Sequence, residues 1–172
     1  MTAKTRHDER GQEDVGQVAG PRPDIDLTTK NPLRLGVAYG DTVWLNTPGE
    51  LIRVRAEDLR GLADRVAAVR QQHPGRDVLV DIDVVIAGEA RWARAALAKA
   101  GGAPDHGTLL YVGTAMGLAG LVADLYVLGL VDGAMLIPLM GEDISALIRD
   151  VVLPELATLM PDPIQQTHSR PA

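Results

Sequence analysis

The 172-residue chain has no cysteine and no phenylalanine, and it has only two tryptophans and three tyrosines. Without cysteine the protein forms no disulfide and offers no thiolate ligand to a metal ion, which fits a reducing compartment such as the cytoplasm. With so few aromatic residues, the hydrophobic core must consist of Leu, Val, Ile and Ala. Such a core offers few rings on which a base or a planar cofactor could stack.

The chain also lacks a long apolar run, an N-terminal secretion signal and a basic cluster. No stretch approaches the ~20 apolar residues of a membrane-spanning helix, so we expect a soluble cytoplasmic protein without a membrane partner. The net charge is −6 and the arginines alternate with acidic residues, which argues against a nucleic-acid partner. No histidine has a second ligand at metal-binding spacing, so no metal site is predicted. The histidines are His7, His73, His106 and His168.

The apolar residues that are present suffice for one ordinary domain core, since they make up 46% of the chain. Residues 1–32 combine mixed charges with Gly, Gln and Pro and have almost no large apolar residues, which predicts a disordered polar arm. Apolar residues become frequent from Leu33 onward, and residues 161–172 are polar again. We therefore predict one folded α/β domain over residues 33–160, followed by a polar tail.

Residues 42–100 contain signals for a strand, a helix, a strand and a helix in turn. Thr42–Leu45 predicts a short strand, and the capping-box spacing of Thr47 and Glu50 predicts a helix from there to about residue 72. The Val- and Ile-rich run 78–87 predicts a strand, and the Ala-rich run 89–100 predicts a helix. Arginines on the first helix alternate with acids, as is typical of a solvent-exposed face. They are Arg53, Arg55, Arg60, Arg65 and Arg70.

Residues 111–138 predict a glycine turn, an amphipathic helix, a second turn and a buried strand. Gly113 permits a tight turn, and Thr114 is the expected N-cap of the helix. Gly129 ends this helix. The uncharged run Ala134–Ile137 is of strand length, and such runs usually belong to parallel sheets that are covered on both faces.

The last predicted element is a helix that begins at Glu142 and Asp143, where negative charge favours a helix start, and that is disturbed near its end by Pro154. Strands and helices thus alternate along the chain, which predicts right-handed parallel βα units. An eight-stranded barrel typically needs ~250 residues, so the ordered part of this chain supplies only about three of its units.

Five short segments stand out as a set: Val37–Trp44, Arg76–Asp81, Tyr111–Thr114, Val131–Gly133 with Ile137-Pro138, and Val152–Leu156. Each segment alone is common in proteins, whereas five in one order with sensible spacing are more specific. In this order they resemble the C-terminal half of luciferase-like flavin-dependent monooxygenases. The resemblance covers roughly residues 33–159.

The resemblance implies a fold, a cofactor and a reaction. Members of the family look like (β/α)8 barrels that bind reduced FMN or a deazaflavin at the C-terminal mouth and oxidise small organic substrates with oxygen. The match therefore implies the C-terminal portion of a (β/α)8 TIM-type barrel. The turn that holds the flavin phosphate in the family is missing from residues 26–32. We accordingly expect an oxidoreductase that is incomplete alone and is completed by a separate N-terminal half or by homo-oligomerisation.

Four residues are candidates for binding the flavin. Trp44 and Asn46 come at the end of the first predicted strand, where barrel enzymes keep their active sites, so both could line the isoalloxazine pocket. Trp44 could instead plug one end of the aliphatic core, and this interpretation is favoured. Gly113 and Thr114 could cradle an anion at the helix start, although capping alone also explains Thr114. The sequence identifies no catalytic residue.

Two acids, Asp81 and Asp83, lie two residues apart on the strand 78–87, so both carboxylates lie on one face, opposite Val80 and Ile82. Such a pair could act as general acid and base or could hold a metal ion. Acids that point into water from the end of a strand give the same pattern, and this interpretation is favoured.

Two functions therefore stay open. The first is a flavin-dependent monooxygenase that acts on a small organic substrate. The second is a non-catalytic, truncated relic that keeps its βα units as an oligomerising or interaction module, since exposed strand edges promote pairing between chains.

Overall fold

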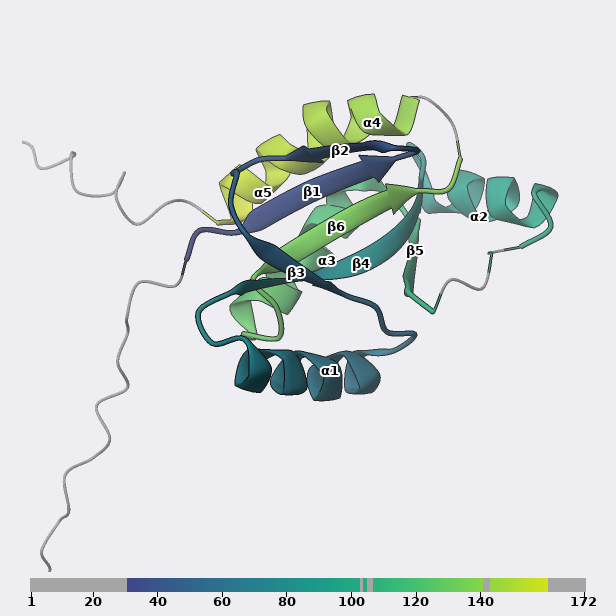
Figure 1. Cartoon of the computed structure of the whole chain (residues 1–172). Helices are drawn as coiled ribbons and strands as arrows, with labels where there is room; N and C mark the ends of the chain where they lie inside the picture. The colour runs from purple at the N-terminus through teal and green to yellow at the C-terminus, as the bar shows by residue number, and fades with distance from the viewer. Residues whose placement is uncertain (1–30, 103, 105–106, 141–142, 161–172) are drawn as a thin grey trace, which may run out of the picture. The chain divides into compact units, whose positions relative to one another are not determined.

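The computed structural model describes residues 31–102, 104, 107–140 and 143–160, which belong to one compact unit beginning at Asn31 (Figure 1). The predicted arm up to residue 30, the predicted tail at 161–172 and Glu142 lie outside the described residues. Asn31 is tied to the fold at two points, because its side-chain amide donates to Asp77 and its carbonyl accepts a hydrogen bond from the Tyr126 hydroxyl.

The described residues form an α/β fold in which strands and helices alternate after an initial hairpin. In chain order the elements are β1 (Arg34–Tyr39), β2 (Thr42–Leu45), β3 (Leu51–Val54), α1 (Leu59–Gln72), β4 (Asp77–Ile86), α2 (Ala90–Lys99), β5 (Leu109–Gly113), α3 (Ala115–Val127), β6 (Gly133–Pro138), α4 (Asp143–Leu147), the π-helical segment η1 (Ile148–Val152) and α5 (Leu153–Leu159).

The strands form one curled sheet in the order β2-β1-β6-β4-β3, and β5 also pairs with β4. All pairings are parallel except that of β1 with β2, which is antiparallel. Strand β3 pairs with β4 from Asp77 to Val80, and β5 pairs with it from Ile82 to Ile86. Strand β6 pairs with the opposite edge of β4. The short strands β3 and β5 therefore share the remaining edge one after the other, and Asp81 lies between the stretches that they pair with.

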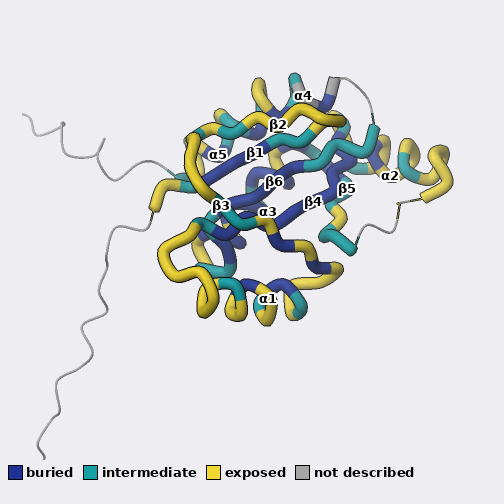
Figure 2. The backbone as a smooth tube through the Cα atoms, viewed as in Figure 1, coloured by how far each residue is buried: buried dark blue, intermediate teal, exposed yellow. Residues whose placement is uncertain are grey.

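The two faces of the sheet are covered differently. Even-numbered residues of β4 join side chains of α1, α3, η1 and α5 in one aliphatic core. Other buried side chains, among them Leu79, Met135 and Ala93 of α2, lie outside this cluster. Three helical connections link parallel strands: β3–α1–β4, β4–α2–β5 and β5–α3–β6. The second moves along the sheet in the opposite direction to the other two. With right-handed crossovers, its helix α2 therefore lies on the other face of the sheet. Figure 2 shows β1, β6 and β4 as the buried centre of the fold and α1 and α2 as partly exposed.

The predicted α/β class and its parallel strands are confirmed. The strand order is not the sequential order of a (β/α)8 barrel, because β6 lies between β1 and β4 rather than beside β5. Among the described residues no helix has the length and apolar character needed to cross a membrane.

The helix predicted to start at Thr47 is wrong over its first part. Leu51–Val54 is strand β3, and α1 begins only after Asp58, whose carboxylate accepts a hydrogen bond from the Gly61 amide at 2.7 Å. The backbone at Gly49 has φ +143°, which no helix permits. Thr47 and Glu50, the residues of the capping-box signature, therefore lie in a loop. The residues that follow form strand β3 because they pair in parallel with the edge of β4.

The segment Tyr111–Gly113 is the end of strand β5 rather than a turn. A Cβ on Gly113 would lie 2.5 Å from the Tyr111 hydroxyl, so close packing explains this glycine. The prediction of α3 is confirmed, including Thr114 as its N-cap, with the hydroxyl accepting from the Gly117 amide at 3.2 Å. The final helix is interrupted by η1 just before Pro154, because proline has no N–H to continue the α-helical pattern.

The amino ends of β1 and β4 are joined by a buried ion pair. The Nη1 atom of Arg34 lies 2.6 Å from Asp77, and its Nη2 donates to the Thr47 carbonyl at 2.8 Å. Arg34 is 5% exposed. The pair therefore fixes the loop before β3 against the sheet.

We expect Gly133→Ala to lower the free energy of unfolding by about 3 kcal/mol or more, as overpacking against backbone does. Its Cβ would lie 1.8 Å from the Arg34 carbonyl oxygen, in the β1–β6 ladder. Gly120→Ala in α3 is the control, because apart from the adjoining backbone of its own helix no atom lies within 4 Å of its Cβ, and alanine favours helices. Urea denaturation of both variants measures the difference. Equal midpoints would contradict the β1–β6 register.

Candidate functional site

The carboxyl ends of β1, β3 and β6 border an open cavity of about 600 Å³, which we call the mouth cavity. Ligands of open α/β sheets bind at this edge. The wall combines the end of β1, the start of β2, the end of β3, the residue before β5 and the end of β6. Its lining residues are Ala38, Gly40, Val43, Arg53, Arg55, Thr108, Ile137 and Pro138.

Two arginines of this wall share one buried acid. Arg53 binds Asp81 through two parallel hydrogen bonds, Nε to Oδ1 at 2.7 Å and Nη2 to Oδ2 at 2.9 Å. Arg55 donates from Nε to Oδ2 of the same carboxylate at 3.1 Å. The side chain of Asp81 is 1% exposed, whereas those of Arg53 and Arg55 are 34% and 61% exposed. The arginines therefore reach inward to the acid from the cavity wall.

The second acid of β4 is also buried. Asp83 is 2% exposed, and its Oδ2 accepts a hydrogen bond from the Thr108 hydroxyl at 2.8 Å. Asp81 and Asp83 do lie on one face, as predicted, but the interpretation that they point into water is wrong. Their charges lie in the interior because Arg53, Arg55 and Thr108 reach them from neighbouring strands.

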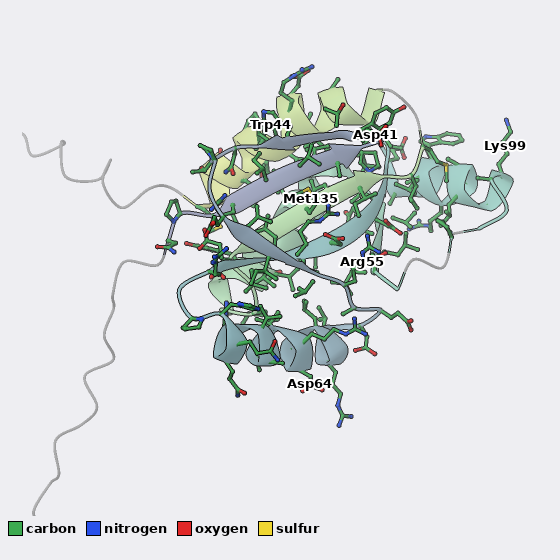
Figure 3. The ribbon with its side chains drawn as sticks, in the orientation of Figure 1. Asp41, Trp44, Arg55, Asp64, Lys99 and Met135 are labelled. Atoms are coloured by element: carbon green, nitrogen blue, oxygen red, sulfur yellow. The ribbon has the colours of Figure 1, made fainter. Side chains whose placement is uncertain are left out.

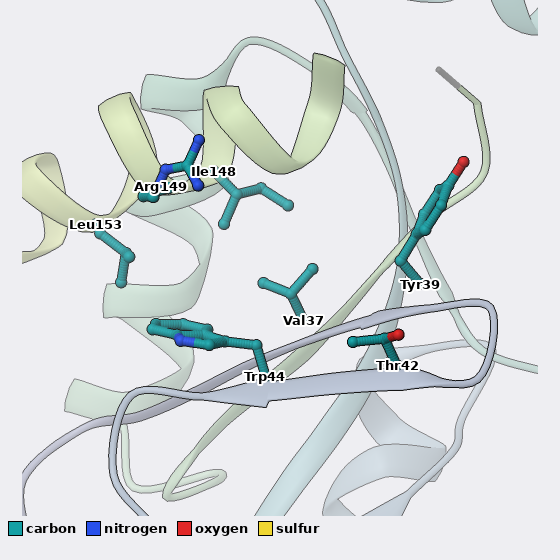
Figure 4. A pocket seen from close by; sticks show the side chains of 7 residues that line it. All are labelled: Val37, Tyr39, Thr42, Trp44, Ile148, Arg149 and Leu153. Atoms are coloured by element: carbon teal, nitrogen blue, oxygen red, sulfur yellow. The ribbon is translucent and has the colours of Figure 1, made fainter. Parts of the chain in front are cut away.

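A second cavity, the edge cavity, has a volume of about 270 Å³ and lies between the β1–β2 hairpin and the last helices (Figure 4). It is mostly apolar. Figure 4 shows the Trp44 ring below Leu153 and Ile148, with Arg149 above. Its lining residues are Val37, Tyr39, Thr42, Trp44, Ile148, Arg149 and Leu153.

Trp44 and Asn46 are not at the mouth, because β2 runs antiparallel to β1 and carries the chain back toward the amino end. Trp44 pairs with Val37 and lines the edge cavity with 44% of its surface exposed, so it partly covers the aliphatic core. The Asn46 side chain bridges the main chain of Leu33 and Leu35, and both its amide and its oxygen are used there.

Gly113 and Thr114 lie at the carboxyl end of β5, and three strands, β1, β6 and β4, separate β5 from β2. The side chain of Thr114 caps α3, and its carbonyl accepts from the Tyr111 hydroxyl at 2.9 Å. The structure therefore does not gather the four predicted flavin-binding residues in one place. Figure 3 shows Trp44 on β2 well apart from Arg55, a residue of the mouth cavity wall.

Metal-binding groups do not cluster in the described part of the chain, where no three His, Asp or Glu side chains meet. His73 is the C-cap residue of α1, and the other three histidines lie outside the described residues.

The sequence interpretation missed Arg53 and Arg55, which it placed on a solvent-exposed helix face. Their i, i+2 spacing is a strand signal, since it puts both side chains on the face that carries Asp81. That signal could have been found only by reading residues 51–55 as a strand.

No protein-family model matches this chain, and a search of curated proteins gives no match. The resemblance to luciferase-like monooxygenases rests on the sequence segments alone.

We expect Arg53→Ala to lower the free energy of unfolding by about 1–3 kcal/mol, because it leaves the buried Asp81 without its bidentate partner. Arg55→Ala should cost about 1 kcal/mol or less, since its exposed side chain supplies one hydrogen bond. Urea denaturation at neutral pH gives both values. Equal losses of unfolding free energy in the two variants would contradict this prediction, because they would show that both arginines stabilise Asp81 to the same extent.

Proposed function

We propose that this chain is the C-terminal part of a luciferase-like, flavin-dependent monooxygenase, which binds reduced FMN or a deazaflavin together with a small organic substrate. The observation that supports it best is the mouth cavity at the carboxyl ends of β1, β3 and β6, because α/β enzymes bind their ligands at this end of the sheet. The sequence resemblance supports the choice of cofactor.

The size and the lining of the mouth cavity support the choice of a flavin. Its volume of about 600 Å³ lies within the usual range for small-molecule and cofactor sites. Val43, Ile137 and Pro138 offer apolar surface to a ring system, and Arg53 and Arg55 offer hydrogen-bond donors beside it. These residues, rather than the four predicted from sequence, would hold the cofactor.

Reduced flavin would supply the activation of oxygen, and the chain's own residues would bind, orient and partly shield it. The mouth cavity is open, so a separate N-terminal half or a second copy would have to close it. A barrel origin of the fold belongs to this proposal. The curled sheet supports it, whereas the place of β6 between β1 and β4 is a feature that a complete eight-stranded barrel would not share.

We expect the full chain to bind FMN saturably, as followed by quenching of flavin fluorescence. Val43→Trp should weaken this binding about tenfold, equivalent to 1.4 kcal/mol, because the indole would occupy the cavity wall. Val127→Trp on α3 is the matched control, since Val127 is exposed and does not line the cavity. Absence of saturable quenching by the wild-type chain would refute the proposal.

A second candidate function is a non-catalytic module that associates with a second copy of itself. Strand β2 lies at one end of the sheet order, and Val43 and Trp44 on it are 52% and 44% exposed. A short, apolar edge strand invites antiparallel pairing with an identical strand.

If this second function holds, the chain is a dimer in solution and Trp44→Lys makes it a monomer, because a charge on an edge strand opposes pairing. Leu128→Lys introduces the same charge at the 72%-exposed C-cap of α3 and should leave the dimer intact. Light scattering after size exclusion measures both masses. A wild-type monomer at all concentrations would exclude this function.

A further inference from the structure

We infer that Arg53 and Arg55 form a binding site for a tetrahedral oxyanion, a phosphate or sulfonate group of a small ligand in the mouth cavity. The inference rests on the proposed function only in placing the ligand there, and it names the part of the ligand that the cavity recognises. The resemblance assigns no role to either arginine.

The first argument concerns the ion pairs of Asp81 with Arg53 and Arg55, which together form the Asp81 network. Among the ion pairs of the described residues, those of Arg34, Arg70, Arg76, Arg91 and Arg149 each join one arginine to one acid. Asp81 instead holds two arginines. Asp83, on the same face of β4, is also buried, so both acids lie in the interior while Arg53 and Arg55 are the charged side chains among the lining residues of the mouth cavity.

The second argument is the orientation of the guanidinium groups. Asp81 is buried and binds Arg53 at two points, which fixes the plane of that group. Within the described part of the chain, Arg55 uses only Nε for hydrogen bonding, so both its terminal nitrogens keep their donors. Asp81 thus acts as a positioning residue, because it holds two sets of donors on one wall of the mouth cavity.

The donors that remain suit a tetrahedral oxyanion. A carboxylate can accept from both arginines, as Asp81 does, but it has only two oxygens. A phosphate or sulfonate has a third oxygen, so it can accept from more of the remaining donors of Arg53 and Arg55. The apolar residues Ile137 and Pro138 on the same wall leave room for the organic part of such a ligand.

The test is a titration of the full chain with inorganic phosphate at constant ionic strength, followed by the arginine Nε–Hε signals in NMR spectra. We expect saturable shifts of the Arg53 and Arg55 signals and at least a tenfold loss of affinity in Arg55→Ala. Arg55→Lys should bind with intermediate affinity, because lysine keeps the charge but loses the fork of donors. Arg60→Ala, which removes an exposed arginine of α1, should bind phosphate like the wild type.

Unchanged phosphate affinity in Arg55→Ala, or an equal shift of the Arg60 signal, would overturn the inference, since either shows binding by general charge. Arg55→Ala is the main variant because its exposed side chain makes misfolding the smaller risk, and dispersed amide signals verify the fold.

Comparison of FMN with riboflavin, which has no phosphate, separates this inference from the proposed function. Tighter binding of FMN than of riboflavin, with the difference lost in Arg55→Ala, supports both. Equal binding of the two flavins, without competition by phosphate, upholds the proposed function and overturns the inference. Phosphate binding at the arginines without any flavin binding upholds the inference and refutes the proposed function.

Discussion

Strand β4 pairs with three other strands, and every residue from Val78 to Ile86 is buried. Strands β3 and β5 are short, and among the described strands each pairs only with β4. Strand β6 joins β4 to the β1–β2 hairpin. The rest of the sheet therefore depends on the hydrogen bonds of this one strand, which explains why its sequence is almost wholly Val, Ile and Leu except at its acids.

Those acids connect the stability of the sheet with the chemistry of the mouth. A buried carboxylate is costly unless it is paired, so Asp81 and Asp83 require partners from neighbouring segments. Arg53 and Arg55 pair with Asp81, and Thr108 donates a hydrogen bond to one oxygen of Asp83. The strand that organises the fold thus also fixes which side chains face the cavity, and a polar site is built without any metal-binding cluster in the described residues.

The sequence predicted those parts whose signals are local. Strand β4, helix α2 and the Thr114 cap of α3 follow from composition, spacing and capping chemistry. Strand β3 was missed because its identity comes from pairing with β4 and not from its four residues. The mouth position of Trp44 was wrong because the two-residue turn at Gly40, with φ +55°, reverses the chain. The Asp81 network joins residues 28 apart, which no local pattern reveals.

The shared edge of β4 also bears on how this fold tolerates change in chain length. Strands β3 and β5 meet β4 in separate stretches, and each has its own register. Residues added between β3 and α1 or between α2 and β5 need not shift either register, because neither strand continues into the other. Both connections carry residues of the mouth cavity, Arg55 and Thr108, so added length there would alter which molecules can enter while the sheet stays as it is.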